Sequence, residues 1–173
     1  MILSDLVGRK LKRKQMISKF KIEQQEELTE FVLGIQNGAA GLGFERNEQL
    51  DLINTYEFFK EGGFWIEEID NEIVGSIGLQ KLNHEIGILR KMFVKKELRG
   101  TNMKIAQRLF DILIKEANNI GFRRILLDTP AIAKASHRFY EKNGFKELNR
   151  ENIPTGYKFP DRDSRIYELI LID

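Results

Sequence analysis

Apolar residues recur along the chain with two different periods, and the clearest change of period lies near its middle. The segment from Ile86 to Val94 is rich in apolar, β-branched and aromatic residues, which predicts a strand, although Arg90 and Lys91 interrupt it. The polar loop KKELRGTNMK, with one glycine, follows it from Lys95 to Lys104. From Ile105 to Ile120 the apolar residues recur every three to four positions, which predicts an amphipathic helix.

Shorter runs with the same two periods predict the remaining elements. Before the central strand we expect a strand (Ile17 to Ile22), a helix (Glu23 to Asn37), a second helix (about Asn47 to Lys60) and two further strands (Phe64 to Ile69 and Glu72 to Lys81). After the central helix we expect a strand (Phe122 to Asp128), a helix from Thr129-Pro130 to Asn143-Gly144 with Ile132, Ala135 and Phe139 at helical spacing, and two strands (Phe145 to Leu148 and Arg165 to Leu171).

The order of these elements predicts the topology of the sheet. Asp70 and Asn71 tolerate the positive φ angles of a tight hairpin turn. Because short turns join the three strands before the central helix, these strands should be antiparallel. The strand that starts at Phe122 is reached through a helix and should lie parallel to the central strand. The predicted fold class is α/β (mixed α+β), with a mixed central sheet of about seven strands and helices on both faces.

Two segments before the hairpin carry further expectations. The first helix is expected to end at Asn37-Gly38, and the second to turn Leu50, Ile53 and Tyr56 inward. Between them lies the glycine-rich segment GAAGLGFER. Because it follows a helix and not a strand, it does not fit a dinucleotide-binding loop. We interpret it as a mobile lip over a substrate site.

Composition and charge exclude several classes of protein. A length of 173 residues and a charged content of 31% are typical of one soluble domain. The net charge of +2 is too small to indicate a nucleic-acid partner. The chain has no cysteine, so it can form neither a disulfide nor a thiolate metal site, and no metal is expected. No apolar run approaches the ~20 residues of a membrane span.

The first residues form a separate region. Residues 1–15 are interpreted as a flexible basic extension and residues 16–173 as a single domain. An arm that binds nucleic acid is the alternative for the extension, but no aromatic residues are interleaved with its charges. The charges follow a very short apolar start, which is the reverse of a signal peptide, so we expect a cytoplasmic protein. The basic residues are Arg9, Lys10, Lys12, Arg13 and Lys14.

The loop before the central helix has the chemistry of an anion site. The first N–H groups of a helix lack internal partners and carry the positive end of the helix dipole. Arg99 and Lys104 add positive charge, as do Lys95 and Lys96, and the small Ala106 allows a ligand to approach the backbone. A phosphate or pyrophosphate fits this pattern. The alternative is an ordinary connection with solvated charges.

Two segments resemble the GCN5-related N-acetyltransferase family. They are VKKELRG…IAQRLFDILIKEA and ASHRFYEKNGF, and the resemblance extends from about Ile17 to Ile172. The family's phosphate loop reads Arg/Gln-x-x-Gly-x-Gly/Ala. Here the loop from Arg99 to Ala106 is two residues longer, with Lys104 in place of the middle glycine, as in a bacterial subgroup with a lengthened loop. The resemblance implies an acetyltransferase domain over residues 16–173.

The resemblance also implies which residues bind the cosubstrate, acetyl-CoA. The backbone of the central strand would pair with the pantetheine arm, at Met92, Phe93 and Val94. The loop and helix start would hold the pyrophosphate, through Arg99, Gly100, Thr101, Asn102, Met103, Lys104, Ile105, Ala106 and Gln107. Phe139 would pack on the cofactor.

By the same resemblance, Tyr140 protonates the thiolate that leaves. A phenol with a pKa of ~10 can donate a proton without being ionised at neutral pH. The alternative is an ordinary core aromatic beside Phe139. A backbone amide near Val94 is suited to stabilise the negative charge that develops on the carbonyl oxygen.

No general base is assigned. Many relatives carry a glutamate on the central strand where this chain has Ile88. Water is one alternative, and the other candidates are Glu67, Glu68, His84 and Glu85. His137 is interpreted as a solvated or capping group.

The function implied is transfer of an acetyl group from acetyl-CoA to a primary amine of a small molecule or peptide by direct attack. A non-catalytic regulatory module that binds acyl-CoA is the alternative. A homodimer is considered, and neither a nucleic acid nor a membrane is expected as a partner.

Overall fold

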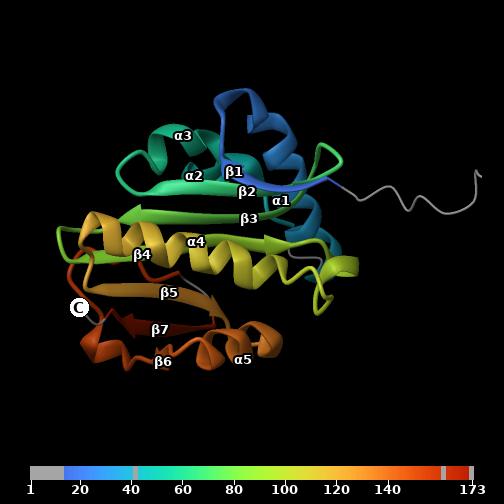
Figure 1. Cartoon of the computed structure of the whole chain (residues 1–173). Helices are drawn as coiled ribbons and strands as arrows, with labels where there is room; N and C mark the ends of the chain where they lie inside the picture. Colours follow the sequence, from blue (N-terminus) through green and yellow to red (C-terminus); the bar gives the residue numbers. More distant parts are fainter. Residues whose placement is uncertain (1–13, 41–42, 161–162, 172–173) are drawn as a thin grey trace, which may run out of the picture.

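Seven strands form one mixed sheet in the order β1-β2-β3-β4-β5-β7-β6. The structure is a computed structural model, which describes residues 14–40, 43–160 and 163–171 (Figure 1). Among the described strands, β4 and β5 pair in parallel and the other neighbours are antiparallel. The strands are β1 (Gln15–Lys19), β2 (Gly63–Ile69), β3 (Glu72–Lys81), β4 (Ile86–Val94), β5 (Arg124–Pro130), β6 (Lys146–Glu147) and β7 (Ser164–Ile170).

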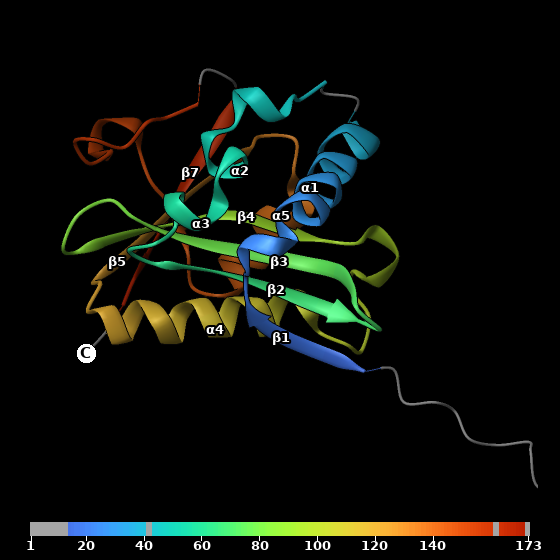
Figure 2. The same ribbon diagram turned by 90° about the horizontal axis from the view of Figure 1, so that it is seen from above.

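Helices cover both faces of this sheet. α4 packs on one face, while α1, α2 and α3 lie on the other (Figure 2). The helices are α1 (Gln25–Ala40), α2 (Leu50–Ile53), α3 (Thr55–Phe58), α4 (Ile105–Ile120) and α5 (Lys134–Lys142), and the short 3-10 turns are η1 (Ile22–Gln24), η2 (Arg46–Glu48), η3 (Lys96–Leu98) and η4 (Arg150–Asn152). The seven-stranded mixed sheet and its helices confirm the predicted fold class.

Buried side chains form a core on each face. On the α4 side, α4 contributes Leu109 and Leu113 and α5 contributes Tyr140. On the α1 side, Leu28 and Val32 of α1 pack with apolar residues of β2 and β3. A third cluster lies over β4, β5 and β7 and includes Ile86, Ile88, Leu126, Tyr157 and Ile166. The loop between η4 and β7 therefore packs on the sheet through Tyr157.

The centre of the chain folds as its pattern predicts. β4 and α4 have the predicted bounds, and β5 is parallel to β4. The hairpin turn between β2 and β3 holds Asp70 at φ 53° and Asn71 at φ 67°. Both are left-handed conformations, which the short polar side chains of Asp and Asn tolerate better than most residues.

The predicted second helix is wrong in both continuity and orientation. It is broken into η2, α2 and α3, and Asn54 caps α3 by accepting a hydrogen bond of 3.2 Å from the Glu57 N–H. Leu50, expected inside, is 69% exposed, and Ile53 and Tyr56 are also exposed. The face that is buried carries Asp51, Leu52, Thr55 and Phe59. Polar partners on α1 and β4 set this orientation, as described below for Asp51.

The predicted end of the first helix is also wrong, because α1 continues through Asn37-Gly38 to Ala40. The Asn37 side chain does not cap the helix. It donates to Phe44 O at 2.9 Å and accepts from Phe44 N–H at 2.7 Å, which ties the following loop to α1. The expected mobile lip lies partly outside the described residues, at positions 41–42, and its mobility stays a prediction.

Several other boundaries differ from the prediction. β1 starts at Gln15 and ends at Lys19, before the Lys21 N–H donates to the Gln24 side chain at the start of η1. β5 is shifted to Arg124–Pro130, so Thr129-Pro130 ends a strand and does not open a helix. α5 starts only at Lys134, which leaves Ile132 84% exposed, and β6 is reduced to Lys146–Glu147.

The proposed N-terminal extension lies mostly outside the described residues, which begin at position 14. The Lys14 N–H donates to the Asp70 side chain, and the Asp70 N–H donates to Lys14 O. Gln15, assigned to the extension, is the first residue of β1. Both residues therefore belong to the folded domain. No helix in the described part of the chain combines the length and the apolar character needed to cross a bilayer.

Candidate active site

β4 and β5 are paired over only part of their length. The paired residues are Ile86 with Arg124, Gly87 with Ile125, and Ile88 with Leu126. Beyond this point β4 continues to Val94 alongside β3, and β5 continues to Pro130 alongside β7. The two strands therefore part after Ile88 and Leu126, and each has an edge that the other does not pair. An extended ligand can add to such an edge through its main-chain groups.

The predicted pantetheine residues Met92, Phe93 and Val94 lie on the part of β4 beyond this split. On their other side, Phe93 pairs with Ser76 and Val94 with Gly75 of β3. The Val94 carbonyl also accepts a hydrogen bond of 2.8 Å from Nε of Arg99. This contact ties the end of the strand to the predicted phosphate loop.

A β-bulge in β4 lies within the same stretch. Arg90 pairs with Gly78 and Phe93 with Ser76, so Lys91 and Met92 together oppose one residue of β3. Lys91 has φ 50°, and its carbonyl accepts a hydrogen bond of 2.8 Å from the buried Ser76 hydroxyl. A bulge of this kind interrupts the strict alternation of side chains.

The bulge turns two consecutive cations towards the α1 face. Arg90 is on this face because it follows Ile88 by two residues and bonds to Gln80 of β3. The Lys91 ammonium group lies 3.3 Å from Asp51 of α2 and also bonds to Gln49. Arg90 and Lys91, the two charges that interrupt the apolar pattern of β4, are therefore the sequence feature that marks the position of the bulge. The bulge itself was not predicted.

The loop from β4 to α4 forms an open helix N-terminus. Lys104 precedes the helix with φ 51°, and the first N–H that bonds back to it is that of Arg108, at 3.0 Å. The N–H groups of Ile105, Ala106 and Gln107 thus belong to the first turn, where helix geometry supplies no internal acceptor. There is no acidic residue in that turn. This arrangement favours an anion.

The structure brings the predicted phosphate residues into one loop but exposes them unequally. Ile105 is buried in the α4-side core, so its contribution to a ligand is limited to its backbone. The half-buried members are Thr101, Met103, Ala106 and Gln107, and the exposed members are Arg99, Gly100, Asn102 and Lys104. The Thr101 hydroxyl donates to Leu98 O at 2.8 Å, which stabilises the turn of the loop.

Gln107 connects this loop to α5. Its Nε2 group donates to Oδ1 of Asn143 and to Oδ1 of Asp111, both at 2.9 Å. Asn143 in turn donates to Phe139 O at 2.9 Å. The start of α4 and the aromatic pair of α5 are therefore held together by side-chain hydrogen bonds.

Tyr140 lies buried among aromatic rings, with 7% of its surface exposed. Its ring packs against Phe139, Phe145 and Tyr167. Burial raises the pKa of the Tyr140 hydroxyl, and the negative charge of Asp128 raises it further. The hydroxyl is therefore held in its protonated form, which is the form that a proton donor needs. Phe139 is half-buried and packs edge-on against Phe110.

Asp128, which the sequence did not single out, lies at the split. It follows Leu126 by two residues, so the two side chains share the α1 face. Oδ1 of Asp128 accepts a hydrogen bond of 2.6 Å from the Tyr157 hydroxyl. The pKa of Tyr157 is raised by burial first and by Asp128 second, while the positive charge of Arg90 lowers it. Asp128 therefore contacts the Tyr157 hydroxyl directly, and Arg90, on the other strand of the split, acts on its pKa through its charge.

The acids named as candidate bases lie elsewhere. Glu67 is buried on the α4 face, where it pairs with Arg108 at 3.1 Å and accepts a hydrogen bond from Gln15. Its second oxygen is buried without a hydrogen-bond partner among the described residues, and burial raises its pKa. His84 and Glu85 are exposed in the turn before β4, at the opposite end of that strand from the bulge.

His137 is not the solvated or capping group that was expected. It is buried, and its Nε2 atom lies 3.0 Å from the carbonyl oxygen of Pro130 at the end of β5. Its ring also packs against Tyr167. His137 therefore anchors the start of α5 to the sheet, close to the aromatic group that contains Tyr140.

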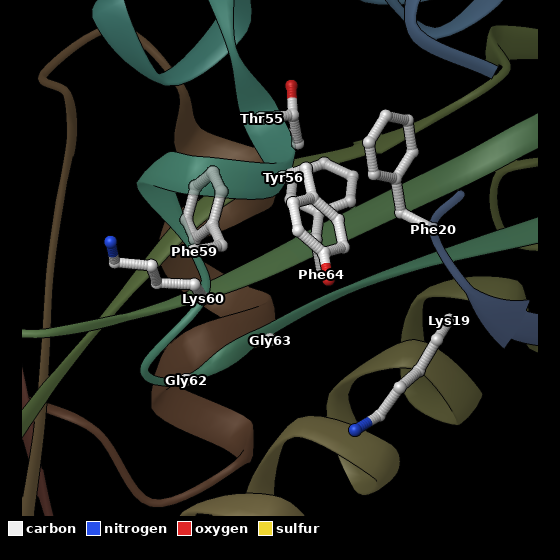
Figure 3. Close-up of a pocket in the computed structure, with 9 residues that line it drawn as sticks. All are labelled: Lys19, Phe20, Thr55, Tyr56, Phe59, Lys60, Gly62, Gly63 and Phe64. Atoms are coloured by element: carbon white, nitrogen blue, oxygen red, sulfur yellow. The ribbon is translucent and has the colours of Figure 1, made fainter. Parts of the chain in front are cut away.

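A cavity of about 220 Å³ lies apart from the split, between β1, β2 and α3 (Figure 3). It is lined by Lys19, Phe20, Thr55, Tyr56, Phe59, Lys60, Gly62, Gly63 and Phe64. In Figure 3 the ammonium groups of its two lysines point away from the aromatic rings. None of the predicted cofactor residues lines it. Within the described ranges, no group of three or more acidic or histidine side chains is placed to hold a metal ion.

The chain belongs to the GNAT acetyltransferase family. The family model "Acetyltransferase (GNAT) family" matches residues 27–145, which is more than half of the chain. The crystal structure of an acetyltransferase from Streptococcus agalactiae 2603 is 34% identical and has a TM-score of 0.86, covering 91% of this chain and 98% of that one. The lengthened-loop subgroup within the family stays a prediction.

Two further relatives extend the comparison. "Probable N-acetyltransferase camello" from Xenopus tropicalis is 30% identical over 115 residues, which is 65% of this chain and 51% of the frog protein. The chain thus spans about half the length of that relative. The PaiA N-acetyltransferase from Thermoplasma acidophilum, solved in complex with coenzyme A, shares the fold, with a TM-score of 0.69 at 21% identity over 91% of this chain and 99% of that one.

Proposed function

We propose that the protein transfers the acetyl group of acetyl-CoA to a primary amine of a small molecule or peptide. The observation that carries this proposal is the split between β4 and β5, with the open N-terminus of α4 connected to the end of β4 through the loop. Family membership supports the same activity.

In this proposal the cosubstrate lies along β4. The backbone of Met92, Phe93 and Val94 pairs with the pantetheine arm, which places the thioester between β4 and β5. The N–H groups at the start of α4, together with the loop from Arg99 to Gln107, hold the pyrophosphate. Phe139, half-buried beside the loop, packs on the cofactor.

The reaction is a direct attack of the amine on the thioester carbonyl. A C–N bond forms, the C–S bond breaks, and the thiolate takes a proton from the Tyr140 hydroxyl. The protonated phenol carries the proton that the thiolate needs, although burial raises its pKa and so makes it a weaker acid. A backbone N–H near Val94 stabilises the negative charge on the carbonyl oxygen during the attack.

Two measurements test the proposal. Calorimetry should show that coenzyme A binds, and acetyl-CoA should release free thiol when amines are added from a panel of polyamines, amino acids and peptides. Binding without thiol release for any amine would instead support the non-catalytic acyl-CoA-binding module. The cytoplasmic location and the homodimer stay predictions.

A further inference from the structure

We propose that the acceptor is an amine that also carries a carboxylate, such as an amino acid, bound on the α1 face of the split. Asp128 receives the ammonium group and Arg90 binds the carboxylate. This inference rests on the proposed acetyl transfer and names the acceptor class of the same site.

The positions of the two residues follow from strand register. Ile88 and Leu126 form the last pair between β4 and β5. Arg90 and Asp128 are the next residues on the same face of the two strands, one on each side of the split. Both side chains are half-buried. A cation and an anion thus flank the point where the proposal places the thioester.

Arg90 is held in place by one edge of its guanidinium group. Nε donates a hydrogen bond of 2.5 Å to Oε1 of Gln80. Among the residues that the structure describes, Gln80 is the only hydrogen-bond partner of the Arg90 side chain, so both terminal Nη groups are available to a ligand. Paired N–H groups of arginine match the geometry of a carboxylate.

The neighbouring cation is already neutralised. Lys91 pairs with Asp51, and the two side chains are only 11% and 12% exposed. The bulge therefore brings two cations to this face but leaves one of them, Arg90, with unused donors. This difference selects Arg90 rather than Lys91 as the carboxylate ligand.

Asp128 is positioned for the ammonium group. The Tyr157 hydroxyl donates to Oδ1 at 2.6 Å and fixes the carboxylate. Asp128 is on the α1 face, whereas Tyr140 packs in the core of the α4 side, so the two groups approach the split from opposite faces. The amine and the leaving thiolate would thus meet different residues, as a direct attack requires.

The proton balance assigns a separate path to each residue. An ammonium group loses two protons when it becomes an amide. One passes to Asp128 before or during the attack and then to solvent. The other leaves the nitrogen for solvent as the amide forms. Tyr140 gives its proton to the thiolate and regains one from solvent, so that thiol, amide and one released proton are the net products.

Thiol release from acetyl-CoA tests the acceptor class with matched probes. Each of a series of L-amino acids is compared with its carboxamide, which keeps the amine but removes the carboxylate. The free acids should give the higher kcat/KM. Arg90→Gln should lower kcat/KM for the free acids by about 10- to 100-fold, the loss expected for charge-assisted hydrogen bonds, and leave the carboxamides nearly unchanged. Arg123→Gln, an exposed arginine at the other end of β5, is the matched control.

A second variant tests Asp128. Asp128→Asn should lower kcat by about 100-fold for amino acids and carboxamides alike, because both must lose an ammonium proton. Hydroxylamine is uncharged at neutral pH, so its reaction should lose much less. A structural defect would slow all three nucleophiles equally and would weaken coenzyme A binding in calorimetry.

Several outcomes would overturn the inference. They are equal use of free acids and carboxamides by the wild type, equal slowing of both by Arg90→Gln, unchanged rates in Asp128→Asn, or no thiol release with any free acid. Thiol release with polyamines alone would refute the acceptor class and leave the proposed acetyl transfer standing. Absence of coenzyme A binding would refute both.

Discussion

The Tyr157 hydroxyl donates a hydrogen bond of 2.6 Å to Asp128, and this contact joins the loop after η4 to the end of β5. The loop is otherwise anchored mainly by apolar contacts of the cluster around Ile86 and Ile166. Tyr157 thus links the packing of the loop to the position of a carboxylate at the split. We treat it as a positioning residue.

Replacing Tyr157 with Phe removes the hydroxyl and keeps the packing ring. We expect about a tenfold loss of turnover with amines that are charged at neutral pH, the effect of one charge-assisted hydrogen bond. Hydroxylamine should be affected less, and coenzyme A affinity should not change. Steady-state thiol release with both nucleophiles checks this expectation. Equal losses for both would show that Tyr157 acts only through the fold of the loop.

Tyr140→Phe tests the proton donor. Turnover should fall by ~10² or more, which is typical of a lost general acid, while the ring still packs and acetyl-CoA affinity barely changes. Single-turnover acetyl transfer and thermal stability should be measured on the same preparation, with Tyr56→Phe as an exposed control. Full activity of Tyr140→Phe would assign the acid role to another group or to water.

Ala106→Leu tests the anion site. A bulky side chain in the first turn of α4 should block the approach of phosphates to the backbone N–H groups and weaken coenzyme A binding by more than tenfold, about 1.4 kcal/mol. Asn118→Leu, at the exposed C-terminal end of the same helix, is the control. An unchanged affinity by calorimetry would remove the loop from the binding site.

The buried Glu67 should make the free energy of unfolding depend on pH. Burial raises the pKa of this carboxyl above its ordinary value of 4.5 more strongly than Gln15 and Arg108 lower it. The ionised form is therefore less favourable in the folded than in the unfolded chain, so this group's contribution to stability falls as the pH rises from about 4.5 through the raised pKa. Glu67→Gln cannot ionise and should remove that fall.

Urea unfolding at about pH 4 and about pH 7 measures this effect. The free energy of unfolding should gain more from Glu67→Gln at the higher pH. Glu68→Gln, at the adjacent half-buried position, should show no such gain. The opposite result, a larger loss at the higher pH, would mean that the ion pair with Arg108 outweighs the cost of burial.

Two deletions locate the boundary of the domain. Removing residues 1–13 should leave the melting temperature and the coenzyme A affinity nearly unchanged. Removing residues 1–15 should lower the melting temperature, because Lys14 pairs with the Asp70 turn and Gln15 starts β1 and bonds to Glu67. A large fall already with the first deletion would show that the basic segment packs on the domain.

The sequence predicts the centre of this fold well because its signals there are local. The change of period between β4 and α4 is sharp, and Asp70-Asn71 specifies its own turn. The prediction of one helix around Asn54 is wrong because a partly polar face is buried there. Asp51 meets Lys91, and Thr55 bonds to Gln25, so tertiary partners override the apolar spacing.

The candidate site is predictable only in part for the same physical reason. The loop from Arg99 to Gln107 and Tyr140 lie in recognisable sequence motifs, so the sequence alone predicts them as site residues. Asp128 follows the apolar run of β5 and carries no local signal, and its place depends on where β4 and β5 part. The left-handed Lys91 depends on the Ser76 hydroxyl, fifteen residues earlier in the chain.

The extra residue at the bulge also shifts the phase of β4 relative to its neighbours. Before it, Leu89 faces α4; after it, Met92 does, three positions on instead of two or four. Deleting Lys91 would restore strict alternation along β4 and leave Met92 and Phe93 on their present faces, because Lys91 is the extra residue. The bulge therefore adds a second cation, Lys91, to the α1 face of β4, while the residues before and after it share one continuous alternation.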